Sequence, residues 1–273
     1  MKKFLSSLTL AAFLATALIA CKKDIKESDP DQLSQSELAE IKAAGFNPQG
    51  AKKIAEGYLV EGDMIVRPED LSSPANGPEI IYANEEHYRT TNTVSASSYP
   101  TIKVRLNNSS ASHEAVFSAA LNEAIRRYNA ESMTIKFQRV TSGANTTVVA
   151  YYEVSNTLGS AGFPTSSRAP YSTVNMNTYH YSTSTSTTNV NYIATIMAHE
   201  LGHCIGFRHT DYMNRAYSCG GAASNEGTAG VGAIHIAGTP TGASAGSWML
   251  ACVGNGANRP FTTADRTALV TVY

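Results

Sequence analysis

Charged residues are scarce in this chain, at 16% of its 273 residues, whereas about 25% is typical of soluble globular domains. This low content argues against a coiled coil and against a disordered acidic tail. The 21 basic and 22 acidic residues leave a net charge of −1, and no lysine follows Lys136. Because nucleic-acid binding needs concentrated positive charge, we expect no nucleic-acid partner. The length allows one large domain or two small ones, with enough chain to bury a core.

Long hydrophobic runs are also missing, except for one at residues 4–20, which follows two lysines. Its length is near the lower limit for a membrane span, and its basic start is typical of a signal peptide. The run ends in Leu18-Ile19-Ala20-Cys21, which resembles the bacterial lipobox, whose cysteine becomes a lipidated N-terminus. We therefore expect residues 1–20 to be removed and Cys21 to be acylated. The protein would then be exported and lipid-anchored to the bacterial cell envelope, at the outer membrane or cell surface. The alternative is an ordinary signal peptide with an incidental cysteine.

Two segments precede the main domain. Residues 21–35 are charged and poor in apolar side chains, which is typical of a solvated tether. Residues 36–95 are too few to form a sizeable core, so we expect them to lean on a larger domain that begins at residue 96. The elements expected in this second segment are a helix from Ser36 to Gly45, a short helix over 48–55, a strand over 58–66 interrupted by Glu61-Gly62-Asp63, and a linker over 67–98.

Residues 96–273 alternate between strand and helix patterns and predict an α+β fold. We expect a mixed, twisted sheet with two long helices over a small irregular lower part that ends in a C-terminal helix. The expected strands cover 102–106, 134–140, 147–154 and 172–176; the expected helices cover 110–128 with Ser110 as the cap, 191–205, and a segment from Thr262 with a capping box to Asp265.

The chemistry concentrates in the second long helix and the turn after it. The segment reads His199-Glu200-Leu201-Gly202-His203-Cys204-Ile205-Gly206-Phe207-Arg208-His209. Histidines four residues apart share a helix face, so His199 and His203 can bind one ion. His209 can join them only after a sharp turn, which Gly206 permits in a left-handed conformation. Three imidazoles leave one position of a tetrahedral zinc for water, and Glu200 lies where it can take the proton of that water as a general base.

The full pattern resembles the metzincin signature, and within that clan the chain is similar to the bacterial dual-action HEIGH metallopeptidases. The resemblance covers residues 99–273. It implies a zinc-dependent endopeptidase with one catalytic Zn²⁺, a protein or peptide substrate, and a methionine turn beneath the metal. We assign that turn to Ser247-Trp248-Met249, with core packing as the alternative role of Met249. The edge of the substrate cleft is expected at Leu158 to Pro164, where a peptide would add by main-chain hydrogen bonds.

The resemblance also makes residues 36–95 similar to a pro-region. Some related families silence the zymogen with a propeptide cysteine, but the only cysteine before the catalytic domain is Cys21, so that latch is not expected. Asp63 or Glu61 could cap the zinc instead. A tyrosine ligand two residues after the turn methionine is not expected either, because Ala251 occupies that position.

Three cysteines remain in the catalytic domain, an odd number that predicts one disulfide and one free thiol. Cys204 lies about 100° around the helix from the preceding histidine and should face the core. The remaining pair, Cys219 and Cys252, is then expected to form the disulfide. Asp211 follows the third histidine closely and is a candidate to orient an imidazole, with a plain surface role as the alternative.

Two other classes of protein remain in view. One is a non-catalytic surface lipoprotein with a structural zinc that binds host protein or glycan, although the open site and Glu200 argue against it. The other is a thermolysin-type hydrolase, which needs an aspartate four residues after a downstream glutamate. Glu226 is followed at that distance by Gly230, so this pattern is missing. We expect a monomer.

Overall fold

The computed structural model describes residues 33–44, 46–71, 87–107, 110–223, 225–226, 232–240 and 244–273. All of them belong to one compact unit, Asp31–Tyr273. The expected signal peptide, Cys21 and most of the tether lie outside the described residues, as does Gly45. Among the helices within these ranges, none combines the length and the apolar character that crossing a membrane would need.

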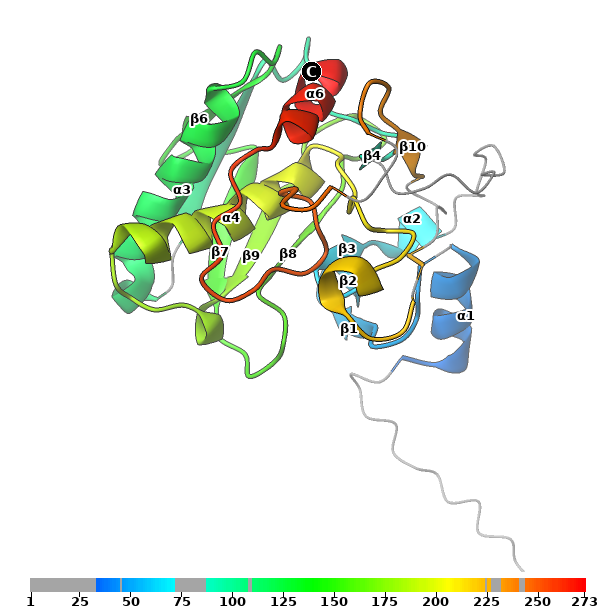
Figure 1. The fold of residues 1–273 in the computed structure, drawn as a ribbon. Helices are drawn as coiled ribbons and strands as arrows, with labels where there is room; N and C mark the ends of the chain where they lie inside the picture. The colour runs from blue at the N-terminus through cyan, green and yellow to red at the C-terminus, as the bar shows by residue number, and fades with distance from the viewer. Residues whose placement is uncertain are drawn as a thin grey trace, which may run out of the picture. The chain divides into compact units, whose positions relative to one another are not determined.

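One eight-stranded sheet runs through the unit in the order β1-β2-β3-β8-β9-β7-β5-β6 (Figure 1). Its strands are β1 (Lys52–Ile54), β2 (Gly57–Val60), β3 (Met64–Val66), β5 (Thr101–Asn107), β6 (Lys136–Arg139), β7 (Thr146–Tyr151), β8 (Gly159–Gly162) and β9 (Thr173–Asn177). β5 pairs in parallel with β6 and β7, β7 pairs in parallel with β9, and β8 runs antiparallel to β9. The sheet is therefore mixed, as the sequence predicted.

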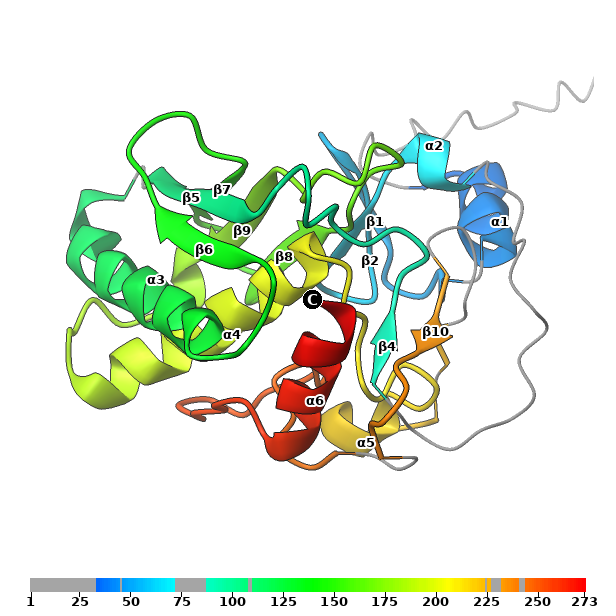
Figure 2. The same ribbon diagram turned by 90° about the horizontal axis from the view of Figure 1, so that it is seen from above.

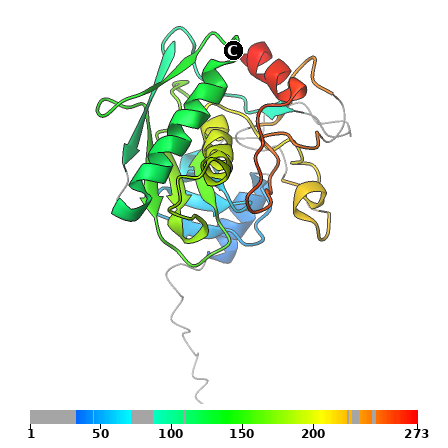
Figure 3. The same ribbon diagram turned by 60° about the vertical axis from the view of Figure 1, so that its left-hand side comes forward.

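Two long helices, α3 (Glu114–Asn129) and α4 (Thr187–Cys204), lie side by side on one face of this sheet (Figures 1 and 3). α3 is amphipathic and buries Val116, Phe117 and Ala120 among others. α4 is buried at every position from Tyr192 to Cys204, which is typical of a helix enclosed by the core on all sides. A helix held this way can fix its side chains with little freedom.

The lower part of the unit is irregular. It holds α5 (Ala216–Cys219), the C-terminal α6 (Thr263–Val272), and a small sheet in which β4 (Tyr88–Arg89) pairs with β10 (Ile234–His235) (Figure 2). Thr262 and Asp265 form the expected capping box at the start of α6. The predicted α+β fold with two long helices and a C-terminal helix is confirmed.

The N-terminal segment completes the sheet rather than forming a unit of its own. α1 (Gln35–Ala43) is capped by Ser34, close to the expected start, and the chain reaches α2 (Pro68–Leu71) after β1, β2 and β3. β3 pairs in parallel with β8, with Met64 opposite Ala161. Buried side chains of the segment, including Ile41 and Met64, pack with Phe163 from beyond β8. The expected strand interrupted before Met64 is the hairpin of β2 and β3.

Four sequence-based expectations about elements were wrong. The linker expected over 67–98 contains the helix α2 and the strand β4, which pairs with β10. The short helix expected over 48–55 is the strand β1, whose residues pair with β2. Ser110 makes no side-chain cap, because a 3-10 turn precedes α3. α4 begins at Thr187 with Ser186 as its cap, four residues before the start expected at 191. Its first turn is polar and exposed, so it carries no apolar periodicity.

Candidate metal centre and active site

The last turn of α4 and the chain after it bring three histidines to one point. His199 and His203 lie one helical turn apart on α4, and the helix ends just before Gly206. Gly206 has φ +104°, and a Cβ there would lie 2.9 Å from Thr90 Oγ1 and 3.0 Å from the Asn92 carbonyl oxygen. Both the backbone conformation and the lack of space therefore require glycine. The turn returns His209 to the two helical histidines, with ring centroids 4.7–5.1 Å apart.

Each of the three imidazoles is oriented by an acceptor at its Nδ1 atom. His199 Nδ1 donates to the Trp248 carbonyl at 2.8 Å, and His203 Nδ1 donates to the Phe207 carbonyl at 2.8 Å. His209 Nδ1 donates to a carboxylate at 2.6 Å. A carbonyl or carboxylate can only accept, so each Nδ1 carries a proton and each Nε2 faces the shared centre, where a neutral imidazole offers its lone pair. Although burial lowers the pKa of His209, Asp63 and Glu226 raise it to about 10, so without a metal ion His209 is protonated on both nitrogens, and its Nε2 would release a proton on binding a metal. His203 Nε2 is buried and has no hydrogen-bond partner among the described residues. Three inward Nε2 atoms, one of them otherwise unsatisfied, fit a divalent cation.

A fourth candidate ligand comes from the hairpin between β2 and β3. Asp63 Oδ2 lies 3.1 Å from His209 Nε2 and 3.6 Å from His199 Nε2, and one ligand atom from each of the four residues falls within 4.8 Å of the others. Burial alone would raise the pKa of Asp63, but the charge of His209 and the imidazole hydrogen bonds hold it well below its usual range. Glu61, the other acid considered for this position, instead faces Arg215 at 3.8 Å.

Glu200 lies beside the histidines, buried against β8. A Cβ on Gly159 would come within 3.0 Å of Glu200 Oε1, so the glycine makes room for the carboxylate. Burial, followed by the negative charge of Asp63, raises the pKa of Glu200 well above its ordinary value. Its Oε2 has no hydrogen-bond partner in the described part of the chain. A buried carboxyl group with a raised pKa and an unpartnered oxygen is suited to taking up and releasing a proton.

Met249 packs against α4 at Gly202, the residue before His203. A Cβ on Gly202, between the two helical histidines, would lie 2.6 Å from Met249 Sδ, and the methionine is fully buried. Its carbonyl accepts from Thr210 N at 2.8 Å, next to the third histidine. The residue therefore fills the core and supports the site at once, so the two alternatives for it do not exclude each other.

The turn that carries Met249 depends on an acid that the sequence analysis assigned only to a helix cap. Asp265 accepts from Ser247 Oγ at 2.6 Å, from Trp248 N at 3.3 Å and from His87 Nε2 at 2.6 Å. Burial by itself raises the pKa of Asp265, but the hydrogen bond from His87 leads the contacts that lower it below its usual value.

The expectation that Asp211 orients an imidazole was wrong. Its carboxylate accepts from Ser218 Oγ and from Ala251 N, so it ties α5 to the chain after the methionine turn. The acid on His209 is Glu226, which is fully buried and is also held by Arg215 at 2.6 Å and Arg208 at 3.5 Å. Although burial raises the pKa of Glu226, these three cationic partners lower it to about 2.

The chain matches the family described as dual-action HEIGH metallo-peptidase over residues 60–273. It belongs to this family. Membership identifies the protein as a zinc metallopeptidase, an enzyme that acts on proteins or peptides. The match begins at residue 60, not at the expected residue 99, so it includes the hairpin that carries Asp63.

No curated protein matches the HEIGH peptidase chain. Among solved structures, one described as "Structure of myroilysin" is similar, with 20% sequence identity and a TM-score of 0.40. That likeness covers 63% of this chain and 92% of the other.

A disulfide fastens the lower part of the peptidase near its metal centre. Cys219, at the end of α5, is bonded to Cys252, three residues after the turn methionine. Cys204 is free and buried, with its side chain in the core cluster rather than among the metal-site atoms.

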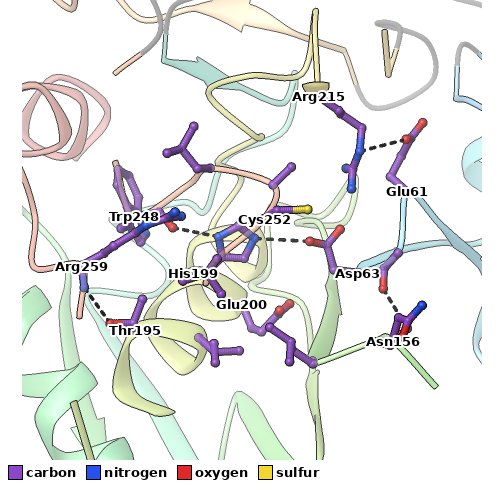
Figure 4. A pocket seen from close by; sticks show the side chains of 18 residues that line it. Glu61, Asp63, Asn156, Thr195, His199, Glu200, Arg215, Trp248, Cys252 and Arg259 are labelled. Carbon is purple, nitrogen blue, oxygen red and sulfur yellow. Dashed lines mark hydrogen bonds and ion pairs between the residues drawn. The ribbon is translucent and has the colours of Figure 1, made fainter. Parts of the chain in front are cut away.

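A cavity of about 390 Å³ opens beside His199 and Glu200 (Figure 4). Its walls come from the β2–β3 hairpin, the loop before β8, α4, and the chain after Met249. The strand expected at the cleft edge, Leu158 to Pro164, contains β8, and β3 covers its free side: Ala161 N donates to the Asp63 carbonyl at 3.0 Å. In this form of the peptidase, the N-terminal segment occupies the strand edge next to the metal centre.

Proposed function

We propose that this peptidase is an endopeptidase with one catalytic Zn²⁺ bound by His199, His203 and His209. The observation that carries the proposal is the convergence of three Nε2 atoms whose Nδ1 atoms are all engaged elsewhere. Imidazole is a preferred zinc ligand, and three protein nitrogens are the usual number at catalytic zinc. An open strand edge, as β8 offers once β3 leaves, suits an extended peptide better than a chain end.

Glu200 is proposed as the general base and then the general acid. When bound, zinc would supply a Lewis acid that polarises the scissile carbonyl and acidifies water. Glu200 would take the proton of the attacking water and pass it to the leaving amine, which needs a carboxyl group that can exist in both protonation states. Its burial and raised pKa support this double role. The backbone of β8 would hold the peptide in place by main-chain hydrogen bonds.

We also propose that Asp63 keeps the described form latent. Its carboxylate occupies the side of the histidine cluster that faces the cavity, and β3 lies along β8 in the parallel sense. Removal of the N-terminal segment would therefore expose both the histidine cluster and the edge of β8. We place the junction of the two parts between Leu71 and His87, because residues from His87 onward support the metal centre: Thr90 N donates to the Gly206 carbonyl at 2.8 Å.

The test is digestion of a denatured protein by the full chain and its Asp63→Ala variant, with bound zinc measured by mass spectrometry and parallel reactions containing a chelator. We expect bound zinc, chelator-sensitive internal cleavage, and faster cleavage by Asp63→Ala. Asp70→Ala changes a carboxylate of the same segment that is paired with Arg67 and should leave the rate unchanged. Bound zinc without cleavage by either protein would favour the non-catalytic surface lipoprotein. Equal rates for Asp63→Ala and the unaltered chain would contradict the latch.

We further propose that the peptidase is an exported monomer anchored to the bacterial envelope through acylated Cys21. The support is the sequence pattern Leu18-Ile19-Ala20-Cys21 after a basic, apolar N-terminus. Intact-mass analysis from the native host should find a chain that begins at lipidated Cys21. A mature chain with unmodified Cys21 would refute the anchor. Sedimentation of the detergent-solubilised chain should show one copy.

A further inference from the structure

We propose that Arg259 makes the cavity beside the metal centre select an acidic side chain, aspartate or glutamate, from the substrate residue that follows the scissile bond. This inference rests on the proposed peptidase function and adds a substrate class to it. It depends on the shape of the cavity, on the state of one arginine, and on the direction of the neighbouring strand.

The cavity can hold one substrate side chain. Its volume of about 390 Å³ is of the order found for small-molecule sites. Much of its wall is apolar and comes from Leu158, Ile196, Trp248 and Val253. Such walls accept the methylene groups of any long side chain, so they provide space without much discrimination.

Arg259 adds a charge to that wall. Its backbone is fixed, because its N–H donates to Thr195 Oγ1 at 3.0 Å and its carbonyl accepts from Arg127 Nη1 at 3.4 Å. The side chain is half-buried and lines the cavity near Trp248 (Figure 4). Within the ranges that the structure describes, its guanidinium makes neither a hydrogen bond nor an ion pair. The scaffold therefore holds the arginine in position while leaving its donors for a ligand.

The other arginines of the site behave differently. Arg208 and Arg215 both form ion pairs with Glu226. Arg259 interacts only electrostatically, without contact, with Asp211 and Asp265. Burial lowers the pKa of the Arg259 guanidinium, and these two remote acids oppose the shift. A partly desolvated cation without a contact partner carries a free-energy cost, which an incoming carboxylate would relieve.

The charge balance of the cavity also changes when the N-terminal segment leaves. The cavity is lined by three acids, Glu61, Asp63 and Glu200, and by two arginines, Arg215 and Arg259. Two of the acids belong to the segment and would depart with it. Since Arg215 remains paired with Glu226, Arg259 would be the unpaired cation left to face the substrate.

The direction of β8 indicates which substrate residue enters the cavity. Asp63, at the metal centre, pairs through its carbonyl with Ala161, while the cavity is lined by residues 156–159, which come earlier in the chain. β3, the occupant of this edge in the latent form, runs parallel to β8, and the proposal takes a cleavable substrate to run in the opposite, antiparallel sense. Such a substrate runs toward lower residue numbers of β8, so its C-terminal half passes over 156–159. The cavity would then receive the side chain on the C-terminal side of the cleaved bond.

The test uses the zinc-loaded full chain carrying Asp63→Ala, cut at a specific protease site introduced between Leu71 and His87 so that β3 can leave β8, together with a library of random peptides whose cleavage products are identified by mass spectrometry. We expect aspartate and glutamate to be enriched about tenfold over asparagine and glutamine after the cut, as a charged hydrogen bond allows. Arg259→Gln should abolish the enrichment, Arg259→Lys should keep most of it, and Arg259→Glu should favour lysine and arginine. Arg266→Gln is the matched control, since Arg266 is exposed and pairs with Glu131 on the surface.

The outcomes separate this inference from the proposed function. Cleavage without acidic enrichment, or with equal enrichment in Arg259→Gln, overturns the inference and leaves the peptidase standing. If no peptide is cut, the peptidase proposal fails and binding decides the inference. Titration with N-acetylglutamate should then raise the melting temperature of the chain but not of Arg259→Gln, with N-acetylglutamine as the neutral control. An equal shift in both proteins overturns the selectivity.

Discussion

Two regions build the metal centre in different ways. α4 is regular and buried, and it contributes His199 and His203 from one face. The irregular chain after it contributes His209, the methionine turn, and the acid Glu226. The helix thus provides two of the three histidine ligands, while the irregular region provides most of the groups that orient the imidazoles.

The difference between them lies in the range of the contacts. His203 is oriented by Phe207, four residues away, but His199 is oriented by Trp248 at a separation of 49 and His209 by Glu226 at a separation of 17. A helix alone would present two histidines with free rotation about their side-chain bonds. Fixing all three Nε2 atoms toward one point therefore requires the folded lower part, which is held around Asp265 and Glu226.

The largest effect is expected on α4, when the proposed base Glu200 is replaced and the three histidine ligands are left unchanged. Glu200→Gln should retain bound zinc, because the three imidazoles and their acceptors are unchanged, yet lose at least about a thousandfold in turnover. His203→Ala should lose zinc itself. The measurements are metal content and the rate of peptide cleavage on the Asp63→Ala background. Normal cleavage by Glu200→Gln would exclude this residue as the base.

The next largest effect is expected in the irregular region. Asp265→Asn should lower the free energy of unfolding by about 2–3 kcal/mol, because Asp265 is buried and accepts from His87, Ser247 and the Trp248 backbone. Urea unfolding of the two proteins measures this difference in the free energy of unfolding. Surface Asp70→Asn, paired only with Arg67, serves as control and should cost less than about 1 kcal/mol.

The same carboxylate predicts a pH dependence. The pKa of Asp265 is lowered in the folded protein, so its stabilising contribution is complete above the ordinary aspartate value and is lost as the pH falls through the folded-state value. Unfolding curves below about pH 4 should therefore converge for Asp265→Asn and the unaltered chain. A constant difference down to pH 2 would contradict the assignment.

The sequence was a good guide where structure is local. The three histidines, Glu200 and Gly206 follow from helix geometry and one turn, and the structure brings these residues together. The mixed sheet and the long helices were predicted because their apolar patterns repeat. Residues 48–55 and 187–190 were misassigned because the first forms a short edge strand and the second is a polar helical turn, and neither shows a strong period.

The acid that orients the His209 imidazole could not be identified from closeness to the histidine in the sequence. Asp211 lies two residues from His209 in sequence, yet its carboxylate turns to Ser218 and Ala251. Glu226 was considered only as part of a missing thermolysin pattern. It is the one acidic residue between Asp211 and Asp265, a signal that gains meaning only when the buried arginines around it are known.

A smaller effect compares these two acids directly. Glu226→Gln keeps an acceptor for His209 Nδ1 but removes the negative charge, so zinc affinity should fall about tenfold. Asp211→Asn should leave zinc affinity unchanged, because Asp211 contacts no imidazole. Competition with a chelator of known affinity measures both. A tenfold loss in Asp211→Asn, with none in Glu226→Gln, would reverse the roles assigned to them.

The smallest expected effect concerns the turn methionine, Met249. Met249→Leu nearly conserves volume, so it should cost about 1 kcal/mol in unfolding free energy and leave zinc affinity within about twofold. Met176→Leu, in the fully buried core of β9, is the matched control and should cost a similar amount. If Met249 acts only by filling space between Gly202 and the turn, the two variants will be indistinguishable in zinc binding. A large loss of zinc in Met249→Leu alone would mean that the sulfur itself, packed against the helix at Gly202, stabilises the metal centre.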